Sequence, residues 1–130
     1  MSQNVPADRR AQLIVILSNA PDVLLAKRIA HILVEEGLAA CVNLGAPGLS
    51  IYAWAGQIEG AQEIPLVIKT TLDRQAEAVS RLVELHPYDV PEVLVLQVAA
   101  ATPEYGAWVH EHTRGPMPGE VESNDVAGSM

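Results

Sequence analysis

The chain has 130 residues, of which 49% are hydrophobic, and this is the size and composition of one domain with its own core. Its formal net charge of −8 argues against partners that need a basic surface, such as nucleic acids and anionic membranes. No apolar run approaches the ~20 residues needed to span a bilayer, and the amino-terminal residues lack a signal-peptide pattern. With a single cysteine, we expect a cytoplasmic protein without disulfides.

The first third of the chain predicts a strand followed by a helix. Residues 12–19 contain the continuous apolar run LIVIL, which is typical of a strand covered on both faces. Asp22 is a suitable N-cap for a helix over 23–36, and Gly37 is a suitable stop. The helical spacing of its apolar residues predicts one buried stripe, formed by Ala26, Ile29, Ala30 and Leu33.

A long β-hairpin is predicted in the middle of the chain. A second strand over 38–44 is interrupted by the Gly- and Pro-containing residues 45–48. Apolar and polar residues then alternate over 49–54 and again over 63–69, on either side of a turn near 55–57.

This hairpin is too long for a small sheet, so its outer part should overhang the domain. An overhanging arm has unpaired backbone groups and an apolar face, and both need a partner. We therefore expect a homo-oligomer, with any functional site near the base of the arm. Pro65 has no N–H to donate, so its side of the strand should lie at an edge or a bulge.

The second half repeats the strand and helix pattern. A helix capped by Thr71 or Asp73 is expected to run to about Leu85, followed by a strand over 93–98 and a short helix that starts at 102–103. The buried stripe predicted for the first of these helices contains Val79, Leu82, Val83 and His86. The order βαββαβ plus a C-terminal helix predicts an α+β chain with the ferredoxin-like split βαβ fold, in which helices cover one face of an antiparallel sheet.

The domain boundaries follow from composition. The folded domain is expected over 11–114, after a flexible arm over 1–10. Residues 115–130 are rich in glycine, proline and acidic residues without periodicity, which predicts a disordered acidic tail.

The densest polar stretch is 86–92, HPYDVPE. Its two prolines hold a histidine, a tyrosine and carboxylates in a rigid loop, which suits a divalent cation or a small polar ligand. Alternatively, the prolines shape a turn and His86 bonds a carbonyl group. Cys41 is either a small buried hydrophobe or, if His86 lies beside it, part of a soft metal site or a nucleophile. Lys69 is a charged strand end, or it pairs with Glu63 on the same strand face.

Several motifs along the chain occur together in one known family. They are LAACVNL (38–44), IYAWAGQI (51–58), VIKTT (67–71), HPYDVPE (86–92) and PEYGAW (103–108). On these residues the sequence resembles the CutA (CutA1) divalent-cation tolerance family over about 12–114. Members read as copper binders can have a cysteine where this chain has Ser18 and a histidine where it has Leu85, so His86 alone of those ligands is kept.

The resemblance implies a PII-like homotrimer of ferredoxin-like subunits that is not an enzyme. It also implies a role in the tolerance of divalent cations, especially Cu²⁺, which the protein binds weakly and does not need for folding. The metal ligands would be His86 and Cys41. The residues of an intersubunit cleft would be Trp54, Glu63, Lys69 and Tyr88. Two alternatives stay open: a PII-like signalling module that binds a small metabolite in that cleft, and a cysteine-dependent hydrolase.

Overall fold

The structure is a computed structural model that describes residues 12–115. The predicted arm over 1–10 and all but the first residue of the predicted tail lie outside this range. The elements of the described chain are β1 (Leu13–Ala20), α2 (Val23–Glu35), β2 (Cys41–Leu44), β3 (Gly48–Trp54), β4 (Gln57–Thr71), a 3₁₀ turn (Leu72–Arg74), α3 (Gln75–Leu85), β5 (Leu94–Gln97) and α4 (Pro103–Glu111). The predicted α+β composition is confirmed. In this part of the chain, no helix is long and apolar enough to cross a membrane.

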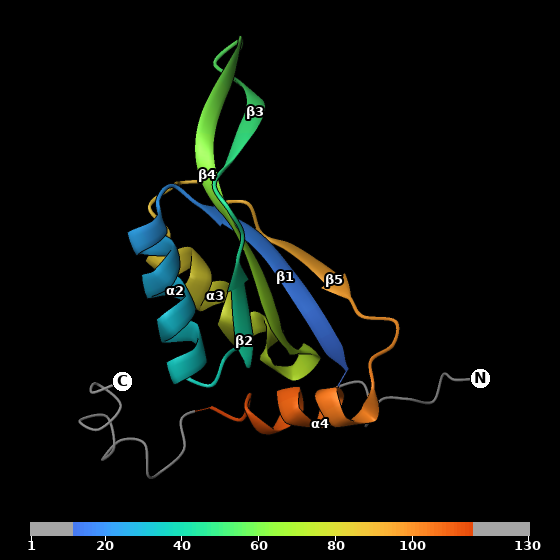
Figure 1. Cartoon of the computed structure of the whole chain (residues 1–130). Coiled ribbons are helices and arrows are strands. Elements are labelled where there is room, and N and C mark those ends of the chain that lie inside the picture. Colours follow the sequence, from blue (N-terminus) through green and yellow to red (C-terminus); the bar gives the residue numbers. More distant parts are fainter. Residues whose placement is uncertain (1–11, 116–130) are drawn as a thin grey trace.

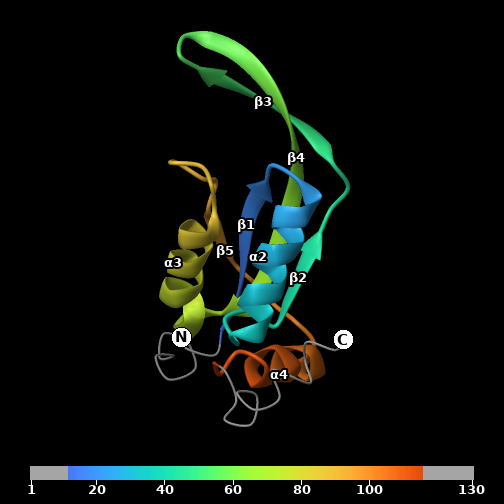
Figure 2. The same ribbon diagram turned by 90° about the vertical axis from the view of Figure 1, so that its left-hand side faces the viewer.

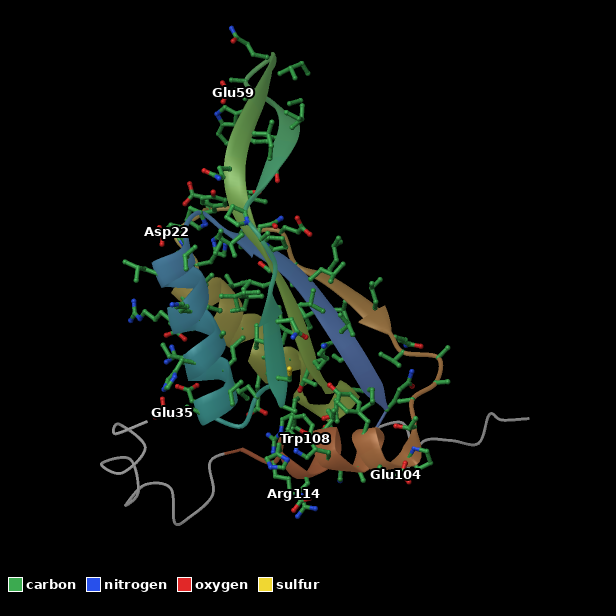
Figure 3. All side chains as sticks on the ribbon, in the orientation of Figure 1. Asp22, Glu35, Glu59, Glu104, Trp108 and Arg114 are labelled. Atoms are coloured by element: carbon green, nitrogen blue, oxygen red, sulfur yellow. The ribbon has the colours of Figure 1, made fainter. Side chains whose placement is uncertain are left out.

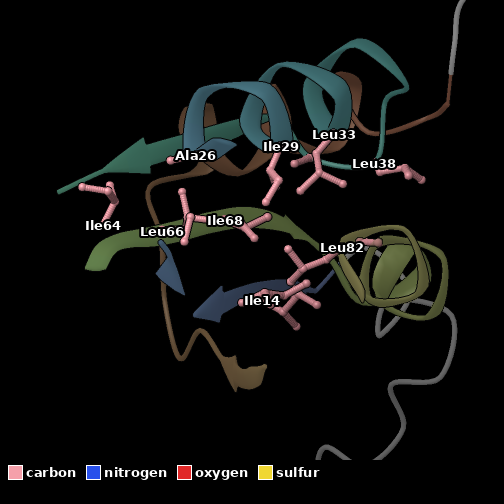
Figure 4. Close-up of a cluster of buried hydrophobic side chains, with 13 residues drawn as sticks. Ile14, Ala26, Ile29, Leu33, Leu38, Ile64, Leu66, Ile68 and Leu82 are labelled. Atoms are coloured by element: carbon pink, nitrogen blue, oxygen red, sulfur yellow. The ribbon is translucent and has the colours of Figure 1, made fainter. Parts of the chain in front are cut away.

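The body of the molecule is an antiparallel sheet with the strand order β2-β4-β1-β5. Helices α2 and α3 pack on one face of this sheet, and α4 crosses one end of it (Figures 1 and 2). The aliphatic core lies between the two helices and the sheet, as Figure 4 shows. Alternate residues of β1 and β4 enter this core, whose members include Ile14, Ile16, Leu66 and Ile68.

The other face of the sheet carries apolar side chains that no helix covers along its length. Leu94 and Leu96 of the edge strand β5 are 53% and 50% exposed, and Val15, Leu17 and Val67 are half-buried. An exposed apolar sheet face of this kind is typical of a surface that another protein chain covers.

The hairpin of β3 and β4 stands away from the body as a separate arm (Figures 1 and 2). β4 is 15 residues long, so its second half pairs within the sheet while its first half pairs only with β3. Ala55 and Gly56 form the turn, and both have positive φ, 52° and 78°. The predicted long hairpin and its turn position are confirmed.

Pro65 lies in a central strand, but it faces an interruption in the neighbouring one. The carbonyl group of Pro65 accepts a hydrogen bond from Gly45 N at 2.9 Å, so the side on which its N–H is missing is the side of residues 45–47. These residues join β2 to β3 and belong to neither strand. The break in the partner chain therefore leaves no ladder bond that would need the missing N–H of Pro65.

The ends of the first helix match the sequence pattern. Asp22 caps α2, accepting a hydrogen bond from Leu25 N at 2.8 Å, and Gly37 follows the helix with φ of 70°. The predicted second strand, in contrast, begins only at Cys41. The preceding residues instead fold back on the helix end, where Leu38 N and Ala39 N both donate to Leu33 O.

The predictions for α3 need two corrections. Neither Thr71 nor Asp73 caps this helix, because the Thr71 hydroxyl donates to the Asp73 carboxylate instead. Of the predicted stripe, Leu82 and His86 are buried and Val79 packs against the core, but Val83 is 44% exposed and Ala78 is buried in its place. A 3₁₀ turn over Leu72–Arg74 precedes α3, which therefore begins at Gln75.

Candidate functional site

A groove of about 810 Å³ runs along the hairpin arm down to its base. Its walls are the arm, from Trp54 beside the turn to Glu63 at the base, together with the loop 86–92 and Asn19 near the end of β1. These segments are distant in sequence, and the loop meets the arm where Tyr88 bonds Glu63. The volume lies within the range of small-molecule sites, about 300–1,000 Å³.

The polar lining of the groove is acidic. Four carboxylates line it, and no lysine or arginine of residues 12–115 does: Glu59, Glu63, Asp89 and Glu92. Two of them are already bonded, since Glu63 accepts from the Tyr88 hydroxyl at 3.1 Å and Glu92 accepts from Asn19 Nδ2 at 2.6 Å. Glu59 projects from the arm itself (Figure 3). A groove lined by one sign of charge concentrates ions of the other sign, so this one attracts cations.

Three aromatic side chains, Tyr52, Trp54 and Tyr88, complete the wall. Burial and then the hydrogen bond to Glu63 raise the pKa of the Tyr88 phenol. The phenol therefore keeps its proton and stays a hydrogen-bond donor at neutral pH. Aromatic rings beside carboxylates offer both flat apolar contact and attraction for a cationic ligand.

His86 does not line the groove itself but contacts Tyr88, which does. It is 7% exposed, and its Nε2 lies 2.6 Å from the backbone oxygen of Asn19. Its Nδ1 accepts a hydrogen bond from Tyr88 N at 3.2 Å, so Nε2 carries the proton and donates to Asn19. The imidazole also contacts the Tyr88 ring edge-on, with 4.7 Å between centroids. Both ring nitrogens are thus engaged by backbone groups of the chain, and the histidine fixes the position of Tyr88.

Cys41 and Lys69 form a second cluster on the uncovered face of the sheet. They are directly opposed in the β2–β4 ladder, and the Lys69 ammonium donates to Asn43 Oδ1. The Cys41 thiol lies 3.8 Å from the same amide oxygen. The pairing of Lys69 with Glu63 does not form, because six residues of extended strand, roughly 20 Å, separate them.

The structure brings together three of the residues predicted for one cleft and separates the rest. Trp54, Glu63 and Tyr88 line the groove, whereas Lys69 does not. Cys41 is level with Val15 of β1 and His86 bonds Asn19, four residues or about 13 Å further along that strand. Cys41 and His86 of the chain therefore do not meet.

The groove residues that the sequence did not indicate are Asn19, Tyr52 and Glu59, whereas Asp89 and Glu92 are the carboxylates predicted in the rigid loop 86–92. Asp89 and Glu92 belong to a loop whose polar density was visible, but nothing local connects that loop to Asn19. Within residues 12–115, no three histidine, cysteine or acidic side chains converge closely enough to hold a metal ion. A cation in the groove would therefore be held by charge and partial coordination.

A family model described as CutA1 divalent ion tolerance protein matches residues 14–112. The chain belongs to this family. Its relatives include the divalent-cation tolerance protein CutA of Thermus thermophilus, 45% identical over 100 residues, which are 76% of this chain and 96% of the relative. The CutA protein of Pectobacterium atrosepticum is 40% identical over 101 residues, 78% of this chain and 92% of the relative.

Solved structures of CutA proteins have the same fold. The crystal structure of CutA from Xylella fastidiosa matches with a TM-score of 0.77 and 41% identity, over 78% of this chain and 98% of that one. The CutA1 structure from Thermus thermophilus matches with a TM-score of 0.76 and 42% identity, over the same shares. The protein from Archaeoglobus fulgidus, described as the periplasmic divalent cation tolerance protein CutA, has a TM-score of 0.76, 32% identity, and coverage of 78% and 99%.

Proposed function

We propose that this CutA1-family chain contributes to the tolerance of divalent cations, Cu²⁺ among them, as a non-enzymatic homotrimer that binds these ions weakly. The observation that carries the proposal is the groove along the arm, which is lined by four carboxylates and by no lysine or arginine of residues 12–115. Because no three ligands converge in the described residues, the ions would be bound weakly.

The homotrimer is supported by two unpartnered surfaces. The open sheet face carries exposed Leu94 and Leu96, and the arm carries Leu49, Ile51 and Ile58 at 70%, 62% and 75% exposure. The strand order also fits a ferredoxin-like subunit, whose open sheet face would meet the other two subunits. Multi-angle light scattering tests this, with three times the chain mass of 13.9 kDa expected and a folded single chain contradicting it.

Calorimetry with Cu²⁺ tests the groove. Glu59→Gln and Glu63→Gln are expected to reduce the heat of binding, because each removes a carboxylate from the wall. Glu104→Gln is the matched control, since it removes the same charge from α4 at the opposite end of the molecule (Figure 3).

His86→Ala distinguishes the carboxylate groove from the alternative implied by the resemblance, in which His86 is a metal ligand. A folded His86→Ala protein that loses its Cu²⁺ heat while Glu59→Gln and Glu63→Gln keep theirs would assign the metal to the imidazole and overturn the carboxylate site. The carboxylate site is supported if His86→Ala and the unchanged protein give equal heats of Cu²⁺ binding while both glutamine variants give smaller ones.

The aromatic wall favours a second candidate, a PII-like signalling module that holds a small metabolite. The volume of about 810 Å³ and the rings of Tyr52, Trp54 and Tyr88 suit an organic ligand better than a bare ion. Native mass spectrometry of protein purified at low salt distinguishes the two, because a retained metabolite adds an organic mass that Trp54→Ala should lose. A protein that carries only metal ions rejects this candidate.

The proposal includes a cytoplasmic location, where a single thiol stays reduced. None of the relatives named above is described by a reaction, which supports a non-enzymatic role. Cell fractionation with antibody detection tests the location, and recovery in the periplasm, the location given for the Archaeoglobus fulgidus protein, would contradict it.

A further inference from the structure

The hairpin arm has two faces of different character. Tyr52 is directly opposed to Glu59 in its antiparallel ladder, so even-numbered residues of β3 and odd-numbered residues of β4 share one face. The exposed aliphatic side chains that favour a partner subunit belong to the other face: Leu49, Ile51 and Ile58. Of the described arm residues that line the acidic groove, all but Ile51 belong to the first face. A subunit that covers the aliphatic face of the arm therefore does not by that contact fill the groove.

The first face of the arm is turned toward the loop 86–92. In Figure 2 the arm bends over the side of the body on which this loop lies. Burial raises the pKa of the Tyr88 phenol most, followed by Glu63 and then by the Tyr52 phenol, so the phenols of loop and arm lie close together. The groove is therefore enclosed between the loop and the polar, aromatic face of the arm.

The aromatic side chains of the groove are open to solvent. Trp54, Tyr52 and Tyr88 are 64%, 42% and 40% exposed. Large rings that gather in one groove while so much of their surface is exposed indicate a surface that contacts a ligand.

The carboxylates of the groove are spread along it. Glu59 and Glu63 lie on the same face of β4, four residues or about 13 Å apart along the strand. Asp89 and Glu92 add two carboxylates from the loop. Neither Glu59 nor Asp89 has an ion-pair partner within residues 12–115. This arrangement matches several positive charges distributed along a chain better than one compact ion.

We propose that the groove binds a linear polyamine, in which ammonium groups are joined by short methylene segments. Its ammonium groups pair with the carboxylates, and its methylene segments lie against the rings of Tyr52, Trp54 and Tyr88. A nucleotide or another phosphorylated metabolite would meet four carboxylates and no lysine or arginine of residues 12–115. This inference rests on the proposed function, since it names a ligand class for the same cation-attracting groove.

Calorimetry of the full-length protein with spermidine tests the proposal. Hexaamminecobalt(III) is the matched ligand, because it has the same charge as spermidine but no methylene groups. Both titrations use the same ionic strength, since salt screens exposed charges. We expect spermidine to bind at least about fourfold more tightly, the contribution of one buried methylene group.

Variants of the groove separate the contribution of charge from that of the rings. Glu59→Gln should weaken the binding of both ligands about fivefold, because each loses an exposed ion pair. Trp54→Ala should weaken spermidine alone, by about threefold, and Trp54→Phe, which keeps a ring, should restore most of its affinity. Glu104→Gln and Trp108→Ala are the matched controls, since they remove the same groups from α4 at the opposite end of the molecule (Figure 3). Both should bind spermidine as the unchanged protein does.

The proposal is overturned if spermidine gives no heat of binding, if it binds no more tightly than hexaamminecobalt(III), or if the α4 controls weaken it as much as the groove variants do. Titration of the same proteins with Cu²⁺ separates this result from the proposed function. Heat with Cu²⁺ but not with spermidine contradicts the polyamine alone, and heat with spermidine but not with Cu²⁺ contradicts the divalent-cation site alone.

Discussion

The hydroxyl of Tyr88 donates a hydrogen bond to Glu63 Oε2 at 3.1 Å, and this contact joins the loop 86–92 to the base of the hairpin arm. The two residues are 25 positions apart, and each belongs to a different wall of the acidic groove. The bond occupies one carboxylate while it orients the phenol. The same contact that shapes the groove therefore also links the stability of the fold to the protonation of a tyrosine.

This linkage predicts a loss of stability at alkaline pH. Burial and then Glu63 raise the pKa of Tyr88 above its ordinary value of 10.0, so the folded state favours the protonated phenol. The resulting stability is complete below pH 10 and is lost as the pH rises through the raised pKa. Because Tyr88 is 40% exposed, solvent screening keeps the effect below about 1 kcal/mol.

Urea unfolding of wild type and Tyr88→Phe on both sides of pH 10 measures this effect. The free energy of unfolding of wild type should fall more across that range than that of the variant. Tyr52→Phe is the control, because it removes a phenol from the same groove without removing a bond to Glu63. Parallel pH profiles for wild type and Tyr88→Phe would contradict the prediction.

The parts of the site that the sequence predicted are those fixed by local pattern. The alternation around the Ala55–Gly56 turn predicted the arm, and the two prolines of 86–92 predicted a rigid polar loop. The contacts of Glu92 with Asn19 and of Glu63 with Tyr88 span 73 and 25 residues, and neither has a periodic signal. The separation of Cys41 from His86 depends on strand register, which no spacing in the sequence reveals.

His86→Ala is predicted to destabilise the fold by about 2–3 kcal/mol. The imidazole is buried and bonds Asn19 O and Tyr88 N, so its removal leaves two backbone groups without partners as well as a cavity. Urea unfolding measures the loss. His110→Ala should cost within about 0.5 kcal/mol, because His110 is exposed on α4. Equal costs for the two substitutions would show that the buried bonds contribute little.

Ser18 gives the opposite prediction, that a substitution stabilises the protein. Its hydroxyl is buried and has no hydrogen-bond partner among the described residues. Ser18→Ala removes an unpaired polar group from the core, so it should raise the free energy of unfolding by up to about 1 kcal/mol.

Thr70→Val is the matched control for Ser18→Ala. It also removes a buried core hydroxyl, but this one donates to Leu38 O at 2.7 Å. Its loss should destabilise the protein by about 1–2 kcal/mol, because the carbonyl is left without that donor. Thermal and urea unfolding measure both variants, and a destabilised Ser18→Ala protein would show that the Ser18 hydroxyl is satisfied.

A substitution at one residue of the turn is predicted to stabilise the arm. Ala55 has φ of 52°, in the left-handed region that costs a residue with a Cβ about 1–2 kcal/mol. Two-residue hairpin turns with positive φ at both positions favour Asn-Gly, and Gly56 already supplies the second residue. Ala55→Asn should therefore stabilise the arm, whereas Gly56→Ala should destabilise it by about 1 kcal/mol or more.

Amide hydrogen exchange in β3 and β4 measures this locally: protection near the tip should rise in Ala55→Asn and fall in Gly56→Ala, while protection in β1 stays constant. Equal protection in all three proteins would mean that contacts beyond the turn, and not its backbone geometry, hold the arm together.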